Sequence, residues 1–434
     1  MRQGDASGYS RTCSRDVLNV EIDLSQYIRS GDAIVWTQTT AEPLTLTEAL
    51  ISQRHTIGHC SAFIGATYSH TLQPEYKDFL HLSSFGGFGF NSRLIDAHAL
   101  DVIPLHCSEI GAMITKGVIP CDVAMLQLSP LGPDGKHSLG ISADYMIEAA
   151  RRARVVIAEV NAQMPWTDTS SMMEGLTIHA QVHSNRPLLE LPAARIGDTE
   201  KKIAHIATSY IEDRAVLELG LGAIPEAILG MLSDRRDLGI HTGVLGDASI
   251  ELVKQGVITN AFKSLDTGKI VTASLLGSQK LYEFGRENAD LALRPYAYTH
   301  AHHNICRLQD FTAINSAIEV DLTGQVNAEW ANGRYVGATG GLVDFVRGAL
   351  AARGGRSIIA LPSTTKDTST SRIVSQIQHG PVTCLRSDAD VVVTEWGAAE
   401  LRGKSVAERT RAMIAIAHPE HRERLERESH VLID

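Results

Sequence analysis

The stretch LGIHTGVLGDASIELVKQG, residues 238–256, combines reactive residue types with a place in the chain where ligands often bind. Its pattern predicts a short apolar strand, a loop, and a helix with Asp247 at its N-cap. His241, Thr242 and Gly243 then fall near the carboxyl end of the strand, which is where open α/β sheets bind ligands. His241 is a candidate general base. Gly243 has no side chain that could react, so its presence here needs an explanation.

A first glycine-rich turn lies in LELGLGAIPEAILGML, residues 217–232. Gly220, Gly222 and Pro225 fall between a predicted strand and a predicted helix. Glycines at such a turn let an anion or a cofactor approach the backbone N–H groups. A tight turn without any ligand would have the same sequence, so both interpretations stay open.

A second glycine-rich turn lies in YVGATGGLVDFVRGA, residues 335–349. Gly340 and Gly341 come directly before a predicted helix that includes Leu342 and Asp344. The N–H groups at the start of this helix would be free to bind an oxyanion or a pyrophosphate. A plain turn is again the alternative.

A third segment crowds hydroxyl groups around a lysine. In LPSTTKDTSTSRI, residues 361–373, Ser363 and Lys366 are candidates for contact with a phosphate or a nucleotide tail. The alternative is an exposed polar turn, which composition alone slightly favours.

Glu42 is the candidate carboxylate outside these turns. It precedes Pro43 at a turn after the predicted strand 32–36, again near the carboxyl end of a strand. A carboxylate in this position could act as a nucleophile. It could also be a carboxylate at a helix N-terminus, stabilised by the helix dipole.

The segment HAHHN, residues 300–304, raises the question of a metal site. On a strand, His300 and His302 would point the same way. A zinc site needs a third ligand and a second shell, and we identify neither in the sequence. Capping, loop or interface histidines are the preferred interpretation, and no metal is predicted.

An α/β fold is expected to position these candidates. Apolar runs without strict alternation are typical of parallel strands, and here they alternate with amphipathic segments, which predicts α/β domains with mostly parallel sheets. Two prolines and a polar turn within 186–200 indicate a boundary, which gives domains 1–193 and 194–434. The predicted strands are 32–36, 123–129, 154–161, 215–220, 357–362 and 390–395, and the helices include 143–153, 199–213 and 405–417.

Length and composition limit the class of protein. The 434 residues are more than one core usually serves, and the formal net charge of −10 argues against a nucleic-acid-binding protein. No apolar run approaches the ~20 residues of a membrane-spanning helix, and the N-terminus lacks the apolar region of a secretory signal. Six scattered cysteines without C-x-x-C spacing indicate reduced thiols. We therefore expect a cytoplasmic protein without a membrane anchor.

Several long segments together resemble the acetyl-CoA hydrolase/transferase family, the group that includes 4-hydroxybutyrate CoA-transferase. The resemblance extends over roughly residues 32–421 and is densest in the second half. The segments that carry it are DVAMLQLSPLGPDGKHSLGISAD (122–144), EVNAQMPWT (159–167), INSAIEVDLTGQVNAE (314–329), GGLVDFVRGA (340–349), GGRSIIALPSTTKDTSTSRI (354–373), VVVTEWGAAELRGKSVAER (391–409) and AIAHPEHRERL (415–425).

The resemblance implies two related open α/β domains, with the active site between them and CoA bound mainly by the second. By position, Gly340 and Gly341 would supply a backbone N–H to the thioester oxyanion. It also implies acyl-CoA as the substrate, no metal, nicotinamide or flavin, and a homodimer or homotetramer. The residues expected around CoA are Gly220, Gly222, Pro225, Thr242, Gly243, Leu342, Asp344, Ser363 and Lys366.

The chain departs from the family at one position. In this family a glutamate attacks the acyl-CoA thioester and becomes an acyl anhydride. CoA then returns to give a glutamyl-CoA thioester, from which a new carboxylate collects the CoA. Members typically have His-Thr-Glu where this chain has His241-Thr242-Gly243, and that glutamate is the nucleophile.

Three interpretations follow from the missing carboxylate. The first is a CoA-transferase for a small carboxylic acid, such as acetate, 4-hydroxybutyrate, itaconate or succinate, that uses another carboxylate: Glu42 first, Glu109 second. The second is direct attack by water or by the acceptor in space opened by Gly243, with His241 or a neighbouring carboxylate as base. The third is an acyl-CoA-binding homologue without activity, because loss of a covalent nucleophile removes most of the rate.

Overall fold

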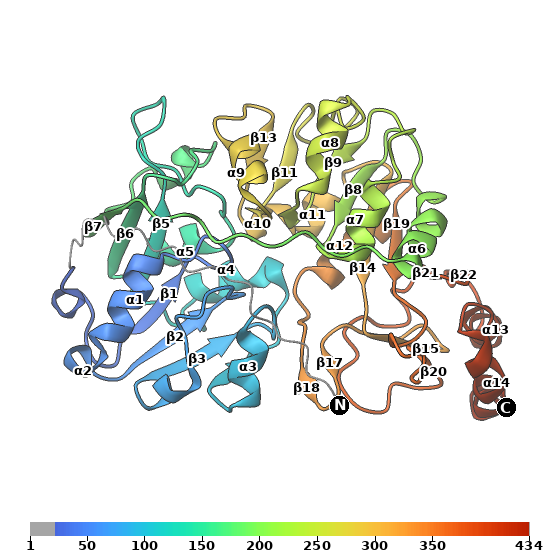
Figure 1. Cartoon of the computed structure of the whole chain (residues 1–434). Coiled ribbons are helices and arrows are strands. Elements are labelled where there is room, and N and C mark those ends of the chain that lie inside the picture. Colours follow the sequence, from blue (N-terminus) through green and yellow to red (C-terminus); the bar gives the residue numbers. More distant parts are fainter. Residues whose placement is uncertain (1–21, 434) are drawn as a thin grey trace.

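The computed structural model describes residues 22–433, so Cys13 lies outside the described residues. Two parallel β-sheets stand side by side, each flanked by helices (Figure 1). The predicted α/β class with mostly parallel sheets is therefore confirmed. Among the described residues, the five cysteines are free thiols. No helix in this part of the chain is long and apolar enough to cross a membrane.

The first sheet has the strand order β4-β3-β2-β1-β5-β6-β7, and all its pairs are parallel. Its alternate residues face two separate apolar clusters, as expected for a sheet buried on both sides. Its strands are β1 Ala33–Trp36, β2 Cys60–Ile64, β3 Leu80–Ser84, β4 Leu100–Val102, β5 Val123–Leu128, β6 Val155–Asn161 and β7 Ala180–Ser184.

The second sheet has the order β22-β21-β19-β14-β8-β9, with only the edge strand β22 antiparallel. A single bridge between His241 and Val271 continues it from β9 to β11, which pairs with β13. Its strands are β8 Val216–Leu219, β9 Gly239–Ile240, β11 Ile270–Thr272, β13 Leu291–Leu293, β14 Phe311–Ser316, β19 Arg356–Ala360, β21 Val391–Thr394 and β22 Gly397–Glu400.

The two sheets repeat one topology. From β7 to β4 the first sheet runs β7-β6-β5-β1-β2-β3-β4, and the second, including the bridge, runs β21-β19-β14-β8-β9-β11-β13. Each has its first strand in the middle, so the strand order reverses between β1 and β5 and again between β8 and β14. Open α/β sheets bind ligands at such reversal points, outside the carboxyl ends of the strands.

Small paired strands lie beside the second sheet. They are β10 Val244–Leu245 with β12 Ser274–Leu275, β15 Glu319–Asp321 with β16 Val326–Asn327 and β20 Ile373–Val374, and the hairpin of β17 Trp330–Ala331 and β18 Arg334–Tyr335.

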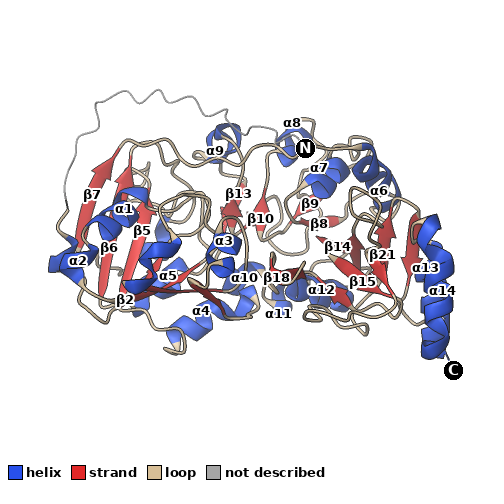
Figure 2. Ribbon diagram, turned by 60° about the horizontal axis from the view of Figure 1, so that its bottom comes forward, coloured by secondary structure: helices blue, strands red, loops and turns tan. Residues whose placement is uncertain are grey.

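Helices cover both faces of the second sheet. Figure 2 shows α6 and α7 on one side and α11 and α12 on the other. The helices are α1 Leu44–Ser52, α2 Arg54–Ile57, α3 Asn91–Asp96, α4 Cys107–Thr115, α5 Met146–Arg152, α6 Asp198–Thr208, α7 Ala223–Leu229, α8 Ala248–Lys254, α9 Gln279–Gly285, α10 Tyr296–Thr299, α11 His302–Ile305, α12 Leu342–Ala351, α13 Val406–Ala415 and α14 Pro419–Ile433.

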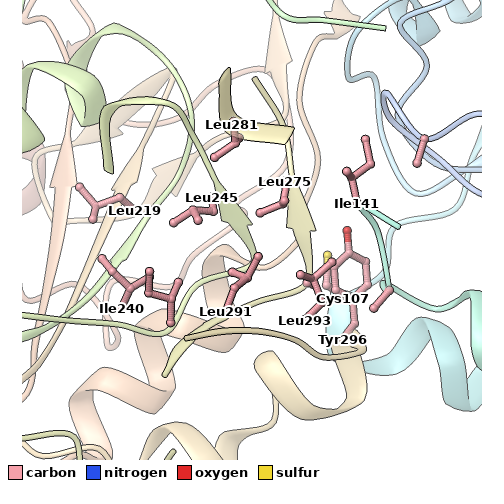
Figure 3. Packing of buried hydrophobic residues seen from close by; sticks show 14 of the residues in the cluster. Cys107, Ile141, Leu219, Ile240, Leu245, Leu275, Leu281, Leu291, Leu293 and Tyr296 are labelled. Atoms are coloured by element: carbon pink, nitrogen blue, oxygen red, sulfur yellow. The ribbon is translucent and has the colours of Figure 1, made fainter. Parts of the chain in front are cut away.

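An extended segment, residues 185–197, joins the two sheets and crosses the molecule from β7 to α6 (Figure 1). It coincides with the predicted boundary region. One apolar cluster nevertheless continues from the first sheet into the second, and Figure 3 shows part of it, with Cys107 and Ile141 beside Leu293 and Tyr296. The division into domains at residue 193 therefore stays a prediction.

Backbone and side-chain contacts hold the two halves together along this shared core. The segment that leads to α12 pairs with the first half, through bridges between Gly86 and Ala338 and between His106 and Gly340. The carboxylate of Asp344 accepts hydrogen bonds from the backbone N–H and the hydroxyl of Ser108, at the start of α4. The start of α12 is therefore fixed by residues of the other half.

Candidate active site

The strand, loop and helix predicted in 238–256 are present as β9, a loop and α8. Asp247 is the N-cap residue of α8 by position, but its carboxylate makes no capping bond to that helix. It instead accepts hydrogen bonds from the N–H and the hydroxyl of Ser278, at 2.9 and 2.7 Å. The predicted N-cap position is confirmed, but the carboxylate does not cap the helix, because Ser278 binds the same oxygens.

The space beside Gly243 is filled by the ring of His300. A Cβ atom placed on Gly243 would lie 2.9 Å from both Nε2 and Cε1 of His300, closer than real side chains approach. A Cβ atom on Gly341 would lie 2.5 Å from the same Nε2. The imidazole therefore lies between Gly243, where the resemblance implies the family glutamate, and the start of α12. Our expectation that Gly243 leaves room for a water or an acceptor is not met at this position.

His300 is buried, with 3% of its surface exposed. Its ring meets Tyr296 edge-on at a centroid distance of 4.7 Å and packs against Phe345 at 4.6 Å. Its Nδ1 is hydrogen-bonded to the Thr299 hydroxyl at 2.8 Å. Burial, and to a lesser extent the nearby His241, lowers the pKa of His300 to about 3, so the ring is neutral at physiological pH.

The histidine cluster differs from the strand arrangement considered for residues 300–304. His300 follows the short helix α10, and α11 begins at His302, so the two side chains diverge. His302 and His303 are exposed, whereas His300 is buried. Within residues 22–433, the structure contains no group of three or more His, Cys, Asp or Glu side chains arranged to hold a metal ion.

His241 lies behind the strand end and not in the same space as His300. Its Nε2 is hydrogen-bonded to the backbone carbonyl of Thr299 at 2.9 Å, and its ring is fully buried near Tyr298 and Phe311. Burial lowers its pKa to about 4. The hydrogen bond to Thr299 supports the segment that carries His300. His241 is therefore placed to position this segment.

The start of α12 presents free backbone donors. Gly341 is its N-cap residue, and the N–H of Gly341 makes no hydrogen bond within the described residues. The first N–H groups of a helix have no partner inside it and favour negative charge. Gly340, with a φ of 52°, turns the chain into the helix, and its carbonyl accepts from the N–H of Cys107 at 3.0 Å. This geometry suits an oxyanion.

The predicted pocket residues of the second half come partly together. Gly220, Pro225 and Thr242 line one small cavity between β8, α7 and β9, with a volume of about 20 Å³. That is room for one water molecule. Gly222, the N-cap residue of α7, has a φ of 120°, a conformation that side chains other than glycine rarely adopt.

The remaining predicted CoA contacts are occupied by protein groups or lie outside the core. Ser363 is buried and donates its hydroxyl to Glu395 at 2.6 Å. Lys366 is exposed on the loop that follows. Leu342 belongs to the apolar core around α12, and Asp344 binds Ser108 as described above. These contacts fix the local fold, and they leave the CoA-binding role of all four residues a prediction.

Glu42 lies at the reversal point of the first sheet, in surroundings drawn from the first half and the 185–197 segment. It is fully buried, and the Thr47 hydroxyl donates to its Oε1 at 2.9 Å. Its Oε2 has no partner within the described residues. Burial raises the pKa of Glu42 to about 7. The groups around it include Gln127, Glu159 and Arg186, whereas the space beside Gly243 is lined by His300 and Phe345.

His300 is a functional candidate that the sequence did not identify. The cluster of histidines raised a metal ligand as an alternative, but capping, loop or interface histidines were the preferred interpretation. The ring's actual position depends on Tyr296, Phe345 and Gly341, and only folding brings the last two near it. A usable signal was the cluster of histidines in residues 300–304, in the same half as Gly243.

The fold and the site together define an enzyme-like α/β protein with two repeated sheets and, between them, a helix start whose Gly341 N–H has no partner within the described residues. Residues 4–179 match the acetyl-CoA hydrolase/transferase N-terminal domain, and residues 277–429 match the C-terminal domain. The chain belongs to this family, which is a family of enzymes. The resemblance inferred from the sequence is thereby confirmed.

Individual relatives cover nearly the whole chain. A 4-hydroxybutyrate coenzyme A transferase of Clostridium kluyveri is 38% identical over 92% of this chain and 94% of its own length. A succinyl-CoA:acetate/propanoyl-CoA:succinate CoA transferase of Fasciola hepatica is 33% identical over 85% of this chain and 81% of its own length. The crystal structure of RipA from Yersinia pestis superposes with a TM-score of 0.88 at 33% identity, covering 94% and 96% of the two chains.

Proposed function

We propose that this chain acts on a small acyl-CoA and moves its CoA to a small carboxylic acid. The single observation that carries the proposal is that Gly243 and Gly341 meet at one buried point between the halves, in a family whose named relatives transfer CoA. The acyl and acceptor groups in those relatives' names, 4-hydroxybutyrate, succinate, acetate and propanoate, are the class of substrate we propose to test here.

In the transferase form of this proposal, Glu42 is the carboxylate that relays CoA. Its buried position and its unpartnered Oε2 support the choice. A raised pKa keeps part of it protonated at neutral pH, so the carboxylate must lose a proton before it attacks. The groups around Glu42 leave no room for a water molecule, so they must move apart before the carboxylate can reach the substrate.

Hydrolysis of the acyl-CoA is the second candidate function. It is favoured by one specific observation: residue 243, where the resemblance implies the nucleophile, is a glycine, and a neutral imidazole fills the space beside it. In this form, water attacks the thioester directly and free CoA is the product.

Intact-protein mass spectrometry after addition of acetyl-CoA, succinyl-CoA or 4-hydroxybutyryl-CoA, without acceptor, tests both forms. A mass gain equal to enzyme-bound CoA supports the relay, and digestion of the protein then identifies the carboxylate. Free CoA without an adduct supports hydrolysis. Binding without either product contradicts both functions and supports an inactive acyl-CoA binder.

We also propose that the protein works in the cytoplasm as a homodimer or homotetramer. Free cysteines support the first part and the family resemblance supports the second. Sedimentation of the purified protein tests the oligomeric state.

A further inference from the structure

The ring of His300 and a side chain at position 243 cannot occupy the same space. With Nε2 and Cε1 both 2.9 Å from a Cβ on Gly243, the ring has to move before any side chain fits at this position. The ring is not free to move, because Tyr296 and Phe345 contact it and Thr299 holds Nδ1. The glycine and the histidine are therefore a matched pair.

The first half of the molecule contributes to holding this pair. The side-chain amide of Gln38 donates to the hydroxyl of Tyr296 at 2.8 Å, and the N–H of Tyr296 donates to the carbonyl of Asp144 at 2.7 Å. Helix α10, which ends just before His300, packs on α4. The imidazole is thus positioned from both sides of the interface between the halves.

Hydrogen bonds decide which ring nitrogen carries the proton. The hydroxyl of Thr299 is within hydrogen-bond distance of Nδ1, at 2.8 Å, and of the carbonyl of Pro295, at 3.3 Å. A hydroxyl has one proton, and a carbonyl can only accept, so both bonds form only if the hydroxyl donates to Pro295 and Nδ1–H donates to the hydroxyl. Nε2 then carries a lone pair, and it makes no hydrogen bond within the described residues.

We propose that His300 is a catalytic base that takes the place of the missing nucleophile. Nε2 accepts a proton from a water molecule while the water oxygen forms a bond to the thioester carbon, and the N–H of Gly341 binds the oxyanion. The tetrahedral intermediate then collapses as the carbon–sulfur bond breaks, and the proton on Nε2 passes to the CoA sulfur. Acyl-CoA and water thus yield the acid and free CoA.

The resting state of the ring agrees with this role. A neutral imidazole is ready to accept a proton, and the oxyanion and the departing thiolate, both negative, raise its basicity as the reaction proceeds. The other titratable groups that face the ring are His241 and Tyr296, and both are buried. The inference rests on the proposed acyl-CoA chemistry, in its hydrolytic form.

The first test compares His300→Ala with His303→Ala, a matched substitution of an exposed histidine on α11. With acetyl-CoA and succinyl-CoA as probes, we expect His300→Ala to lower the rate of free-CoA release by about 10²–10⁴-fold, the range of a general base. His303→Ala should retain the wild-type rate, and CoA affinity should change little in either. A rate within threefold of wild type in a folded His300→Ala protein would overturn the proposal.

The second test restores the carboxylate. Gly243→Glu alone should form no covalent CoA adduct, because the ring occupies the required space. Gly243→Glu combined with His300→Ala should form one when acyl-CoA is added, since a glutamate can then enter and exchange its oxygen for CoA sulfur, releasing the acid. An adduct with Gly243→Glu alone, at the level of the double variant, would contradict the exclusion.

A third measurement separates this inference from the proposed function. In thermal unfolding without ligand, Gly243→Ala should lower the Tm by several degrees in the wild-type background. It should lower the Tm less in the His300→Ala background, where the next atom from the new Cβ belongs to Phe345, at an ordinary contact distance of 3.5 Å. If the two substitutions are coupled but the protein neither releases nor transfers CoA, the proposed function is refuted and the pairing of Gly243 with His300 is supported. Additive effects refute the pairing itself.

Discussion

The two halves of the molecule share a strand order but treat the space beyond their central strands differently. In the first half, the loop after β1 is closed by Gln127, whose amide donates to the carbonyls of Ala41 and Glu42 at 3.1 and 2.7 Å. In the second half, the turn after β8 leaves the small cavity beside Gly220. The reversal point of the first sheet is therefore closed by internal hydrogen bonds, whereas the reversal point of the second sheet retains a small cavity.

The same contrast recurs at the next strand. Gly65, directly after β2, is covered by Gln38 of the same half, whose Oε1 accepts from the N–H of Ala66. Gly243, shortly after β9, is covered by His300, whose Nε2 has no partner among the described residues. The repeated fold thus has a covered glycine at a comparable position in each half. The glycine of the second half is covered by His300, whose Nε2 has no partner among the described residues, and this makes its surroundings the ones suited to chemistry.

The largest expected difference between the halves comes from removing one buried carboxylate in each. Glu42→Gln should lower CoA transfer by several orders of magnitude if Glu42 relays CoA. Glu218→Gln, which changes the buried carboxyl on β8, should leave transfer within a few fold, because Asn315 already binds that carboxyl internally. Steady-state transfer from succinyl-CoA to acetate measures both. Unchanged transfer in Glu42→Gln means that Glu42 serves the fold only.

The second prediction concerns the covered glycine of the first half. Gly65→Ala should lower the free energy of unfolding by about 1–3 kcal/mol, because the new Cβ overlaps the side chain of Gln38. Gln38→Ala should relieve part of this loss in the double variant. Urea unfolding of the four proteins gives the coupling. Equal losses in both backgrounds would show that the overlap is not the cause.

The third prediction uses pH. Burial raises the pKa of Glu218 to about 8 from an ordinary value of 4.5, so the folded state keeps a proton that the unfolded state releases between these values. Stability from this group is therefore full below pH 4.5 and declines as pH rises toward 8. Glu218→Gln removes the decline. Its unfolding free energy relative to wild type should rise by about 1 kcal/mol or more between pH 5.5 and 7.5.

The histidines of the second half act in the opposite direction and serve as the control. The pKa of His241 is lowered to about 4 from 6.5, so the unfolded state gains a proton first as pH falls. Stability from His241 is therefore lost as pH drops below 6.5. The loss is common to wild type and Glu218→Gln, and it cancels in their difference. A difference that does not change with pH would contradict the assignment of a protonated Glu218.

The smallest expected effect lies at the rim between the halves. Arg334 of the β17–β18 hairpin pairs with Asp96 of α3 at 2.6 Å, and both side chains are well exposed. Such surface pairs contribute about 0–1 kcal/mol. Arg334→Ala should lower unfolding free energy by less than about 1 kcal/mol and leave CoA release unchanged. A larger loss would mean that the hairpin, and not the shared core, holds the halves together.

The fold was predictable where a buried strand has a long, mostly apolar sequence. The runs 123–129 and 154–161 are of this kind, and they form β5 and β6 within one residue of the predicted bounds. Strands of two or three residues, such as β11 and β13, have too few side chains to show a period. The repeated strand order could not be predicted from the residue pattern either, because a single bridge between His241 and Val271 completes it.

The site was predictable only where the family resemblance reached it. The resemblance placed Gly243 and Gly341 at one site, and the structure brings both against one ring. The role of His300 was not accessible, because its burial depends on Tyr296 beside it and Phe345 far along the chain. Hydrogen-bond partners such as Ser278 for Asp247 and Ser108 for Asp344 likewise come from distant segments.

The pairing of the α12 entry segment with the first half has a consequence for biosynthesis. Ser108 and Asp344 are separated by 236 residues, so their contact closes only after most of the chain has left the ribosome. Contacts of such long range form late, because loop-closure entropy opposes them until nearby structure is in place. The first sheet is complete by residue 184 and can assemble early, whereas the turn at Gly340 can pair with His106 only after the chain has been made past residue 340. A nascent chain therefore completes the seam around Gly340 only when both sheets have docked, and substitutions at this seam should delay maturation more than they lower final stability.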